Sequence, residues 1–513
     1  MRNLYVFALM CLFVLALAPS GGMVNAAPTG TTIKVSTTLD EVAMNSKCSL
    51  REAILSSNDN KAVGGCPPGT GSDKIIVPAG IYKLTLKGNM VNDPKTGDLN
   101  VRGAVTIKGA GIGETVIDGN KIDRVFHLAT TSINNPSQIT LSDMTIRNGL
   151  ARDGFGGGGI SNTGAQVTLR RVHVMKNKTI QGTGGNSGGG GIINKGFMRL
   201  YDVLLTKNSA PQPTSGIANQ GAAAVNFACT PNCGMEMERV TISDNAPGSG
   251  ALSNNSTLAA VNVTISGNGG DGIENHSQVS SLVMKNGTIA NNGGYGLTEQ
   301  WNATLANVIL DNNTLGNCED LGEQGIVSLG GNVSDDSSCA NHFNASGDQN
   351  DSSPQLGILQ LNGGLTPTHA LAPSSPGIDV GNEVQCPAFD QRGIARPQDG
   401  NGDTTSTCDS GATEFVGTDF TNNPTLQSPA DEAILNKLRV LLDWSDSTFG
   451  AYYQVELRRT SIDGVVIMNV TPLESQIKTG TLQRGFDYLW RVRACNDLGC
   501  SDWTPFRKFT VAQ

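Results

Sequence analysis

The sequence predicts an all-β protein: a right-handed parallel β-helix, or solenoid, with a short N-terminal capping helix, followed by a β-sandwich domain. Three observations predict this fold. A short apolar motif recurs along residues 141–310, Gly- and Asn-rich turns separate its copies, and residues after 416 change to strands rich in aromatic side chains. Only 16% of the residues are charged and 5% are aromatic, so the chain needs an architecture that stacks small residues.

The recurring motif has one apolar residue, two other residues, and then an apolar-x-apolar triplet. Successive triplets end 21 to 37 residues apart, at Ile146, Val174, Leu205, Ile242, Ile265, Ile289 and Leu310. Periods of about 20–40 residues without a helical pattern are typical of a β-solenoid. We therefore expect each repeat to form one coil.

A second series of apolar residues lies between the triplets and often follows a glycine run. Its members are Ile160, Ile192, Ile217, Leu252, Ile273 and Leu297. A phosphate-binding loop or a flexible linker would be the alternative interpretations of the glycines. A strand rather than a helix is expected after each run, and the flanks are regularly apolar, so the glycines are predicted to form turns within the repeat.

Two polar columns follow from this alignment. Rungs of a parallel sheet lie about 4.8 Å apart, so stacked asparagines can hydrogen-bond from coil to coil. The first column contains Asn162, Asn194, Asn219, Asn254 and Asn275. The second precedes the triplets, and its first four members alternate in charge, which predicts ion pairs between neighbouring coils; a charged binding cleft is the alternative. Its members are Asp143, Arg171, Asp202, Arg239, Asn262, Asn286 and Asn307.

An N-terminal helix is expected to cover the first coil. Ser49 and Glu52 form a capping-box pattern, and Leu50, Ala53 and Ile54 share one helical face. The stretch "CSLREAI" is very similar to the motif of the CSLREA domain of secreted bacterial β-helix proteins. The stretches at 361–382 and 386–415 resemble the choice-of-anchor Q segment of the same proteins. This resemblance covers about residues 32–415 and implies a pectin-lyase-like β-helix on an exported protein, with no established reaction.

The remaining segments give the domain organisation. Residues 1–26 resemble a signal peptide. The β-helix is expected over 32–415, with caps at about 48–60 and 354–415, and a linker over 416–430. Residues 431–513 resemble a fibronectin type III domain, with Tyr488, Trp490, Val492 and Ala494 alternating along one strand.

Ten cysteines remain after the expected signal peptide, and an even number in an exported chain predicts disulfides. The simplest connectivity joins near neighbours, although the sequence alone does not fix it. The couples are Cys48 and Cys66, Cys229 and Cys233, Cys318 and Cys339, Cys386 and Cys408, and Cys495 and Cys500. We expect a secreted or extracellular protein, associated with a cell surface or free of it, without a membrane span.

No catalytic or ligand-binding residues are assigned from the sequence. The outward column of the triplets carries no carboxylate pair on adjacent coils, and the five histidines are scattered, with His173 expected as an exposed strand residue. The metal candidate is a calcium site in "DGNGD", with an ordinary Asp/Gly turn as the alternative. Its oxygen ligands would come from Asp399, Asn401, Asp403 and Asp409.

Two functions remain. The first is non-catalytic binding or adhesion to an extracellular polysaccharide or cell-surface component; the second is a polysaccharide lyase or glycoside hydrolase. The net charge of −9, without basic blocks, argues against nucleic acid as a partner. Columns of Asn, Thr and Ser would offer hydrogen bonds to a glycan, and Tyr201, Tyr295 and Trp301 are the aromatic residues available for stacking on sugars. These features favour binding.

Overall fold

The computed structural model describes most of the chain outside its first 29 residues. The described ranges are 30–88, 93–152, 156–180, 188–210, 222–226, 233–246, 250–275, 278–322, 325–416, 424–447, 452–460, 464–496, 499–501 and 503–513. The expected signal peptide, Ile217, Asn219, Cys229 and part of the expected linker lie outside these ranges.

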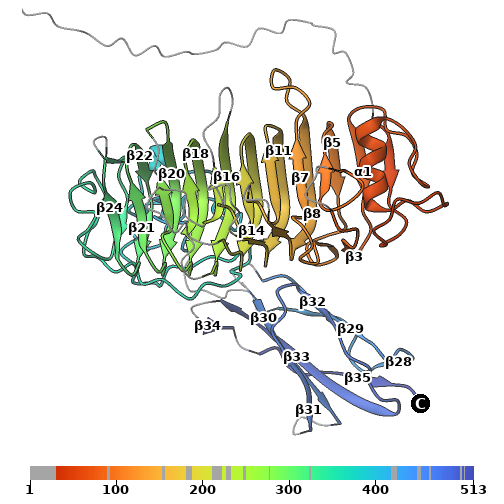
Figure 1. Ribbon diagram of the computed structural model, residues 1–513. Helices are drawn as coiled ribbons and strands as arrows, with labels where there is room; N and C mark the ends of the chain where they lie inside the picture. Colours follow the sequence, from red (N-terminus) through yellow and green to blue (C-terminus); the bar gives the residue numbers. More distant parts are fainter. Residues whose placement is uncertain are drawn as a thin grey trace, which may run out of the picture.

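Residues 32–334 form the predicted parallel β-helix, whose coils follow one another along a single axis (Figure 1). All its named strand pairs are parallel. The first sheet contains β1 (Thr32–Lys34), β2 (Asp73–Ile76), β3 (Gly80–Lys83), β5 (Val105–Lys108), β6 (Thr115–Asp118), β8 (Gln138–Arg147), β11 (Gln166–Met175), β14 (Phe197–Thr206), β16 (Gly234–Ser243), β18 (Thr257–Ser266), β20 (Ser281–Ala290), β22 (Ala303–Ala306), β23 (Ile309–Asp311), β25 (Ile326–Ser328) and β26 (Val333–Ser334).

A second parallel sheet closes the coils. It contains β4 (Leu99–Val101), β7 (Phe126–Ala129), β10 (Ile160–Thr163), β13 (Ile192–Asn194), β15 (Ala222–Asn226), β17 (Gly250–Asn254), β19 (Ile273–Asn275), β21 (Tyr295–Glu299) and β24 (Gly316–Asp320). A separate two-stranded parallel sheet pairs β9 (Leu150–Ala151) with β12 (Lys178–Thr179).

Six strands of the first sheet are ten residues long, and each bends at its sixth residue. These six residues and Asn307, between β22 and β23, have left-handed backbones with φ between 48° and 58°. They are the residues of the predicted charged and Asn column. The left-handed residue shifts the two-residue alternation by one position, so Leu169 and Val172 of β11 both point inward although three residues separate them. This shift explains the spacing of the repeat motif.

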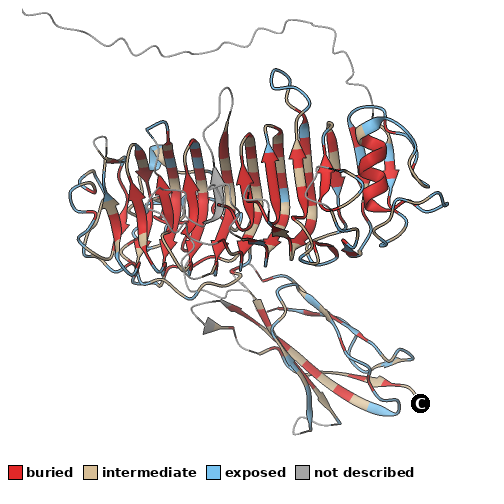
Figure 2. Ribbon diagram, in the orientation of Figure 1, coloured by how far each residue is buried: buried red, intermediate tan, exposed pale blue. Residues whose placement is uncertain are grey.

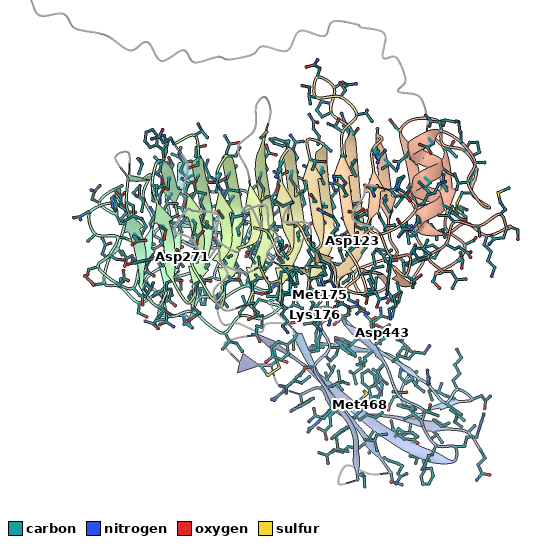
Figure 3. All side chains as sticks on the ribbon, viewed as in Figure 1. Asp123, Met175, Lys176, Asp271, Asp443 and Met468 are labelled. Atoms are coloured by element: carbon teal, nitrogen blue, oxygen red, sulfur yellow. A yellow bond between two sulfur atoms is a disulfide. The ribbon has the colours of Figure 1, made fainter. Side chains whose placement is uncertain are left out.

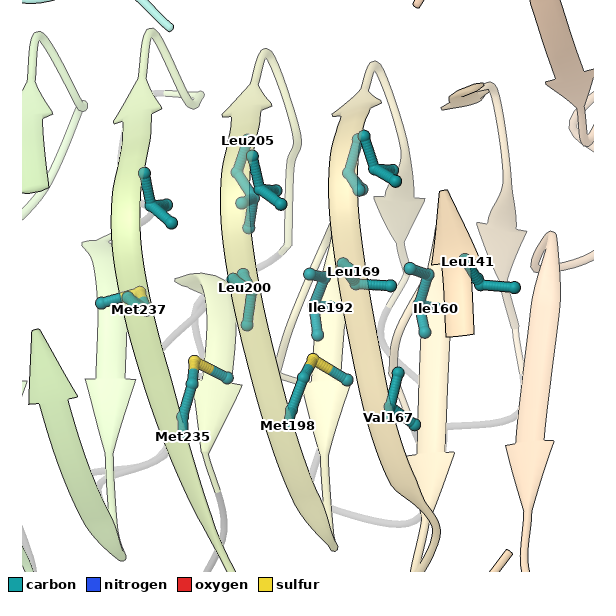
Figure 4. Close-up of a cluster of buried hydrophobic side chains, with 14 of the residues drawn as sticks. Leu141, Ile160, Val167, Leu169, Ile192, Met198, Leu200, Leu205, Met235 and Met237 are labelled. Carbon is teal, nitrogen blue, oxygen red and sulfur yellow. The ribbon is translucent and has the colours of Figure 1, made fainter. Parts of the chain in front are cut away.

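Apolar side chains stack along the axis in the interior. Leu169, Leu200 and Met237 occupy the same position in successive coils, and Met198 and Met235 occupy the next inward position (Figure 4). These five side chains are at most 2% exposed. Figure 2 shows the same buried interior along the solenoid, with exposed residues at the turns.

Helix α1 (Leu50–Asp59) covers the first coil, as the sequence predicts. Ser49 accepts from the Glu52 amide, and the Glu52 carboxylate accepts from the Ser49 amide, so the capping box is complete. Leu50, Ala53 and Ile54 are buried in the same core cluster as the coils. A disulfide joins Cys48 to Cys66 beside the helix.

Residues 354–415, called here the C-terminal segment, run back along the outside of the β-helix with little regular structure beyond the 3-10 helix η1 (Glu383–Gln385). The segment begins beyond the last coil, where Leu371, Ile378 and Phe415 pack on Ile309 and Val333. Disulfide Cys386–Cys408 lies within it.

The last residues form a two-sheet sandwich with its own core. One sheet has the order β27 (Leu426–Ser428), β29 (Leu441–Trp444) and β32 (Gln476–Lys478). The other has the order β28 (Ala433–Leu435), β35 (Arg507–Val511), β33 (Phe486–Asn496), β30 (Tyr452–Arg459) and β31 (Val466–Val470), with β34 (Gly499–Cys500) beside β33.

Two features of the sandwich follow from its sequence. Tyr488, Trp490, Val492 and Ala494 are all buried, as their alternation predicts. The Tyr488 hydroxyl donates to the Gln483 carbonyl at 3.0 Å. Such a tyrosine corner is a hallmark of immunoglobulin-like sandwiches.

Candidate functional site

The outward Thr column of the triplets, which the sequence offers as a hydrogen-bonding surface, is covered in the later coils by the C-terminal segment. The Thr241 hydroxyl donates to the Pro367 carbonyl at 2.6 Å, the Thr264 hydroxyl donates to Gln391 Oε1 at 2.7 Å, and Thr288 accepts from the Ala412 amide at 3.0 Å. All three threonines are at most 1% exposed. This half of the sheet is therefore closed to a ligand.

The predicted Asn column is internal as well. Asn162 donates to Asn194 Oδ1 and Asn254 donates to Asn275 Oδ1, each at 2.7 Å, which confirms the predicted stacking. Asn219 lies outside the described residues, and strand register puts Asn226 of β15 at the position between Asn194 and Asn254.

A second buried Asn column was missed from the sequence. Each Nδ2 donates to Oδ1 of the asparagine in the next coil at 2.7–3.3 Å. Its members are Asn177, Asn208, Asn245, Asn268, Asn292 and Asn313. Each lies three residues after the end of a triplet, so an alignment of the repeats is enough to predict this column. The amides of both columns are used within the fold.

The first halves of the long strands leave an open face. The C-terminal segment reaches only its edge, where the Thr366 hydroxyl donates to the Arg239 carbonyl at 3.3 Å. A group of aromatic and charged side chains lies on this face over three adjacent strands, and we call it the lateral patch. It consists of Arg170 of β11, Phe197, Arg199 and Tyr201 of β14, and Glu236 and Glu238 of β16.

Strand register and side-chain stacking fix the lateral patch. Arg170, Tyr201 and Glu238 are neighbours across the strands, as are Arg199 and Glu236. The Arg170 guanidinium carbon lies 4.2 Å from the centre of the Tyr201 ring. Arg199 lies 4.6 Å from the Phe197 ring centre and donates to Glu236 at 2.8 Å.

Ion pairs border the lateral patch as predicted. Arg171 pairs with Asp143 at 2.6 Å and Arg239 pairs with Asp202 at 2.7 Å, each pair joining neighbouring coils. Arg239 also contacts Glu238. The two arginines of the lateral patch are matched in number by its two glutamates, so the surface is a mixed-charge face without net charge.

The lateral patch suits adsorption of a polar polymer better than proton transfer. The Arg199 and Glu236 side chains are 41% and 46% exposed, and Glu238 is 42% exposed, so charged groups line a flat, accessible sheet. Glu236 and Glu238 form a carboxylate pair on one strand, outside the triplet columns. Each has an arginine partner, whereas a general acid needs a protonated carboxyl group.

The other predicted aromatic residues lie elsewhere. Tyr295 belongs to β21 of the second sheet, and Trp301 follows that strand, where its amide donates to Glu299. His173 is half-buried rather than exposed, and burial lowers its pKa to about 4. In the strand register it lies between Thr145 and Leu204.

The four residues predicted to bind calcium lie in two separate places in the structure. Asp399 accepts from the Gly402 and Thr404 amides, Asn401 from Asp403, and Asp403 from Thr405, all at 2.7–2.9 Å in an exposed turn. Asp379, missed from the sequence, accepts from the Asn401 amide at 2.7 Å. Among the described residues no cluster of three or more His, Cys, Asp or Glu side chains is arranged for a metal. Calcium binding stays a prediction.

The fourth member, Asp409, is 1% exposed and belongs to a different network. It accepts from the Asp379 amide at 2.8 Å, and its own amide donates to Glu414, which pairs with Arg396 at 2.8 Å. Burial, and then the negative charge of Glu414, raise the pKa of Asp409 to about 8. The network anchors the C-terminal segment.

Four of the five expected cysteine couples form disulfides: Cys48–Cys66, Cys318–Cys339, Cys386–Cys408 and Cys495–Cys500. The partner expected for Cys233 lies outside the described residues. No helix in the described ranges has the length and apolar character needed to cross a bilayer.

A comparison with family models agrees with the parallel β-helix. A family model described as a right-handed β-helix region matches residues 201–341. The A-module of a mannuronan C-5 epimerase from Azotobacter vinelandii is 14% identical, with a TM-score of 0.26, over 50% of this chain and 91% of that module. The twitchin kinase region of C. elegans is 20% identical, with a TM-score of 0.15, over 17% of this chain and 16% of that one. Curated proteins gave no match.

Proposed function

We propose that this protein binds an extracellular polysaccharide along the lateral patch and leaves the polymer intact. The observation that carries the proposal is the pair of outward rings, Tyr201 and Phe197, each held by an arginine on an otherwise flat sheet. The rings offer apolar surface to the C–H faces of sugars, and the guanidinium and carboxylate groups around them match hydroxyl groups.

A polymer fits this surface better than a compact ligand. The open face continues beside the lateral patch along the first halves of the neighbouring strands. In one direction it carries Thr168, Thr140 and Thr106, which are neighbours across three adjacent strands. Rungs about 4.8 Å apart let an extended chain meet several coils. Each contact is small, so the proposed binding is weak and multivalent.

The state of the acids supports binding without cleavage. A lyase or glycosidase needs an acid and a base placed on either side of one bond. Glu236 and Glu238 are each engaged by arginine, and Asp409, whose pKa is raised, is buried within the C-terminal segment. A polysaccharide lyase or glycoside hydrolase remains the alternative for the same face.

Export and surface association form part of the proposal. The local disulfides suit an oxidising compartment. The CSLREA-like helix and the choice-of-anchor-like C-terminal segment support a secreted β-helix protein of that kind. The strand order and tyrosine corner support a fibronectin type III-like sandwich that acts as a spacer or adhesion module.

A panel of neutral and acidic polysaccharides, tested by affinity electrophoresis with the full chain, examines the proposal. Tyr201→Ala should weaken binding to the glycan that the panel identifies about tenfold, because it removes the ring on which Arg170 stacks. Phe389→Ala is the matched control, since this aromatic side chain is 56% exposed and belongs to the C-terminal segment.

Two outcomes would contradict the proposal. Equal binding by the parent and Tyr201→Ala would remove the lateral patch as the site. Release of reducing or unsaturated sugar ends that Glu236→Gln abolishes would establish the enzyme alternative instead.

A further inference from the structure

The outer face of the larger sheet of the sandwich carries a second arrangement of arginine and aromatic side chains, independent of the lateral patch. We call it the arginine–aromatic ladder. It consists of Arg458 of β30, Arg491 and Arg493 of β33, and Trp503 and Phe506 of the segment before β35.

Rings and guanidinium groups alternate in the ladder. The centre of the Trp503 ring lies 4.6 Å from the guanidinium carbon of Arg493 and 4.4 Å from that of Arg491. The Phe506 ring centre lies 4.5 Å from Arg491 and 5.6 Å from Arg458. Stacking on rings fixes the guanidinium planes before any ligand arrives.

The charges of the ladder do not cancel. Arg458 and Arg491 share one carboxylate, that of Glu456, which is only 8% exposed behind them. Arg493 donates through Nε and Nη2 to the neutral Gln454 Oε1 at 2.9 and 2.7 Å. Among the described residues no carboxylate lies within ion-pair distance of Arg493. Among the described residues, Arg491 and Arg493 thus have one carboxylate between them, that of Glu456, on a chain of net charge −9.

The free donors point to the ligand chemistry. Nη1 of Arg491 and of Arg493 has no hydrogen-bond partner among the described residues. A planar guanidinium edge matches a carboxylate with two parallel hydrogen bonds. Arg491 and Arg493 are two residues apart on one strand, so their side chains repeat at about 7 Å, a spacing that an extended polymer with regular carboxylates can follow.

We propose that the arginine–aromatic ladder binds the carboxylate groups of an acidic, uronate-bearing polysaccharide. The sandwich then contributes its own contact with the polymer, beyond holding the β-helix at a distance. Two linked sites on one chain also raise the effective concentration of each for a long polymer.

Binding of the full chain to polygalacturonate, measured by isothermal titration calorimetry, tests the proposal. Fully methyl-esterified polygalacturonate is the control polymer, because it keeps the backbone and loses the charges. Arg493→Gln should weaken binding to polygalacturonate about tenfold, because it removes a charge-assisted pair of hydrogen bonds. Arg439→Gln, an exposed arginine on the other side of the sandwich, removes the same charge and should leave the affinity within twofold.

Two further variants sharpen the test. Arg493→Lys keeps the charge but loses the fork, and should stay at least threefold weaker than the parent chain. Arg493→Gln should weaken binding to polygalacturonate by the same factor in the Tyr201→Ala background as in the parent chain, which separates the ladder from the lateral patch. Unchanged thermal unfolding of each variant would establish that the fold is intact. If Arg493→Gln unfolds, the affinity of Arg493→Lys tests the proposal in its place.

Several results would overturn the proposal. Equal losses of affinity for Arg493→Gln and Arg439→Gln, or equal binding of the esterified polymer, would show that the polymer binds without a specific site at the ladder. Full recovery by Arg493→Lys, or equally tight binding of dextran sulfate or single-stranded DNA, would overturn the assignment to carboxylates. Loss of binding in Tyr201→Ala alone would move the site to the lateral patch.

Discussion

Buried amide side chains connect neighbouring coils of the β-helix. Asn268 shows the arrangement: it accepts from Asn245 at 2.7 Å, donates to Asn292 at 2.9 Å and also donates to the Ile242 carbonyl at 3.0 Å. An amide has both donors and an acceptor, so it can satisfy a position between two identical neighbours. Such a residue stabilises the stack, and its polar atoms are not available to a ligand.

Asp409 makes stability depend on pH in the opposite direction from an ion-paired carboxylate, whose pKa is lowered on folding. Its pKa is about 8 in the folded chain and ordinary in the unfolded chain, so the folded state keeps a proton that the unfolded state loses between about pH 4 and 8. This contribution to the free energy of unfolding is fully present below about pH 4 and is lost as the pH rises through about 8.

Chemical denaturation of the parent chain and Asp409→Asn at several pH values measures this effect. The parent curve should fall more steeply with rising pH, by about one linked proton in the steepest region. The comparison uses the slope, because the amide also changes the hydrogen bonds to Asp379 and Phe415 and lowers the stability at every pH. Parallel curves would contradict the assignment.

At the scale of elements, each long strand is two strands joined by one left-handed residue. Asp143, Arg171, Asp202 and Arg239 accept this conformation, and the ion pairs between Asp143 and Arg171 and between Asp202 and Arg239 hold it from coil to coil. The second corner is left-handed too: Lys176, just after β11 and labelled with Met175 in Figure 3, has φ 56°. These left-handed positions separate the outer face that the C-terminal segment covers from the outer face that stays open.

Helix α1 protects the open edge of the first coil, and its disulfide fixes it there. Replacing Cys48 and Cys66 together by Ala should lower the free energy of unfolding of the β-helix by about 3 kcal/mol, because the bridge closes a loop of 18 residues in the unfolded chain. Denaturant unfolding followed by circular dichroism measures the loss.

The matched control is Cys495→Ala with Cys500→Ala, a bridge of separation 5 in the sandwich. It should leave unfolding of the β-helix unchanged, because the two cores are separate. An unchanged midpoint in the Cys48 and Cys66 variant would show that the helix holds the first coil without the bridge.

At the scale of the whole molecule, the β-helix divides its outside into a covered and an open face. His369 illustrates the covered face: its ring bonds to Ser266 at 2.8 Å and to the Gly357 carbonyl at 2.7 Å, which fastens the C-terminal segment to β18. The lateral patch lies on the open face, beyond the edge that Thr366 marks.

Sequence patterns predict what repeats and miss what joins distant segments. The coils, the capping box of α1 and the pairing of Arg171 with Asp143 follow from periodic or local residues. The contact of Gln391 with Thr264 joins positions 127 residues apart, with no repeat between them to reveal it. Tyr201 was predicted as a stacking residue, but the rest of the lateral patch was missed for a related reason: Arg170 falls between the apolar positions, where the motif allows any residue.

The molar mass of a bound polysaccharide, followed by size-exclusion chromatography with light scattering, tests the central claim most directly. The polymer that the panel identifies is incubated with the full chain and measured before and after the protein is removed. We predict that polymer and protein elute together, and that the polymer recovered after prolonged incubation has its starting molar mass. A fall in molar mass, with new reducing or unsaturated ends, would contradict the account and identify the open face as a catalytic one.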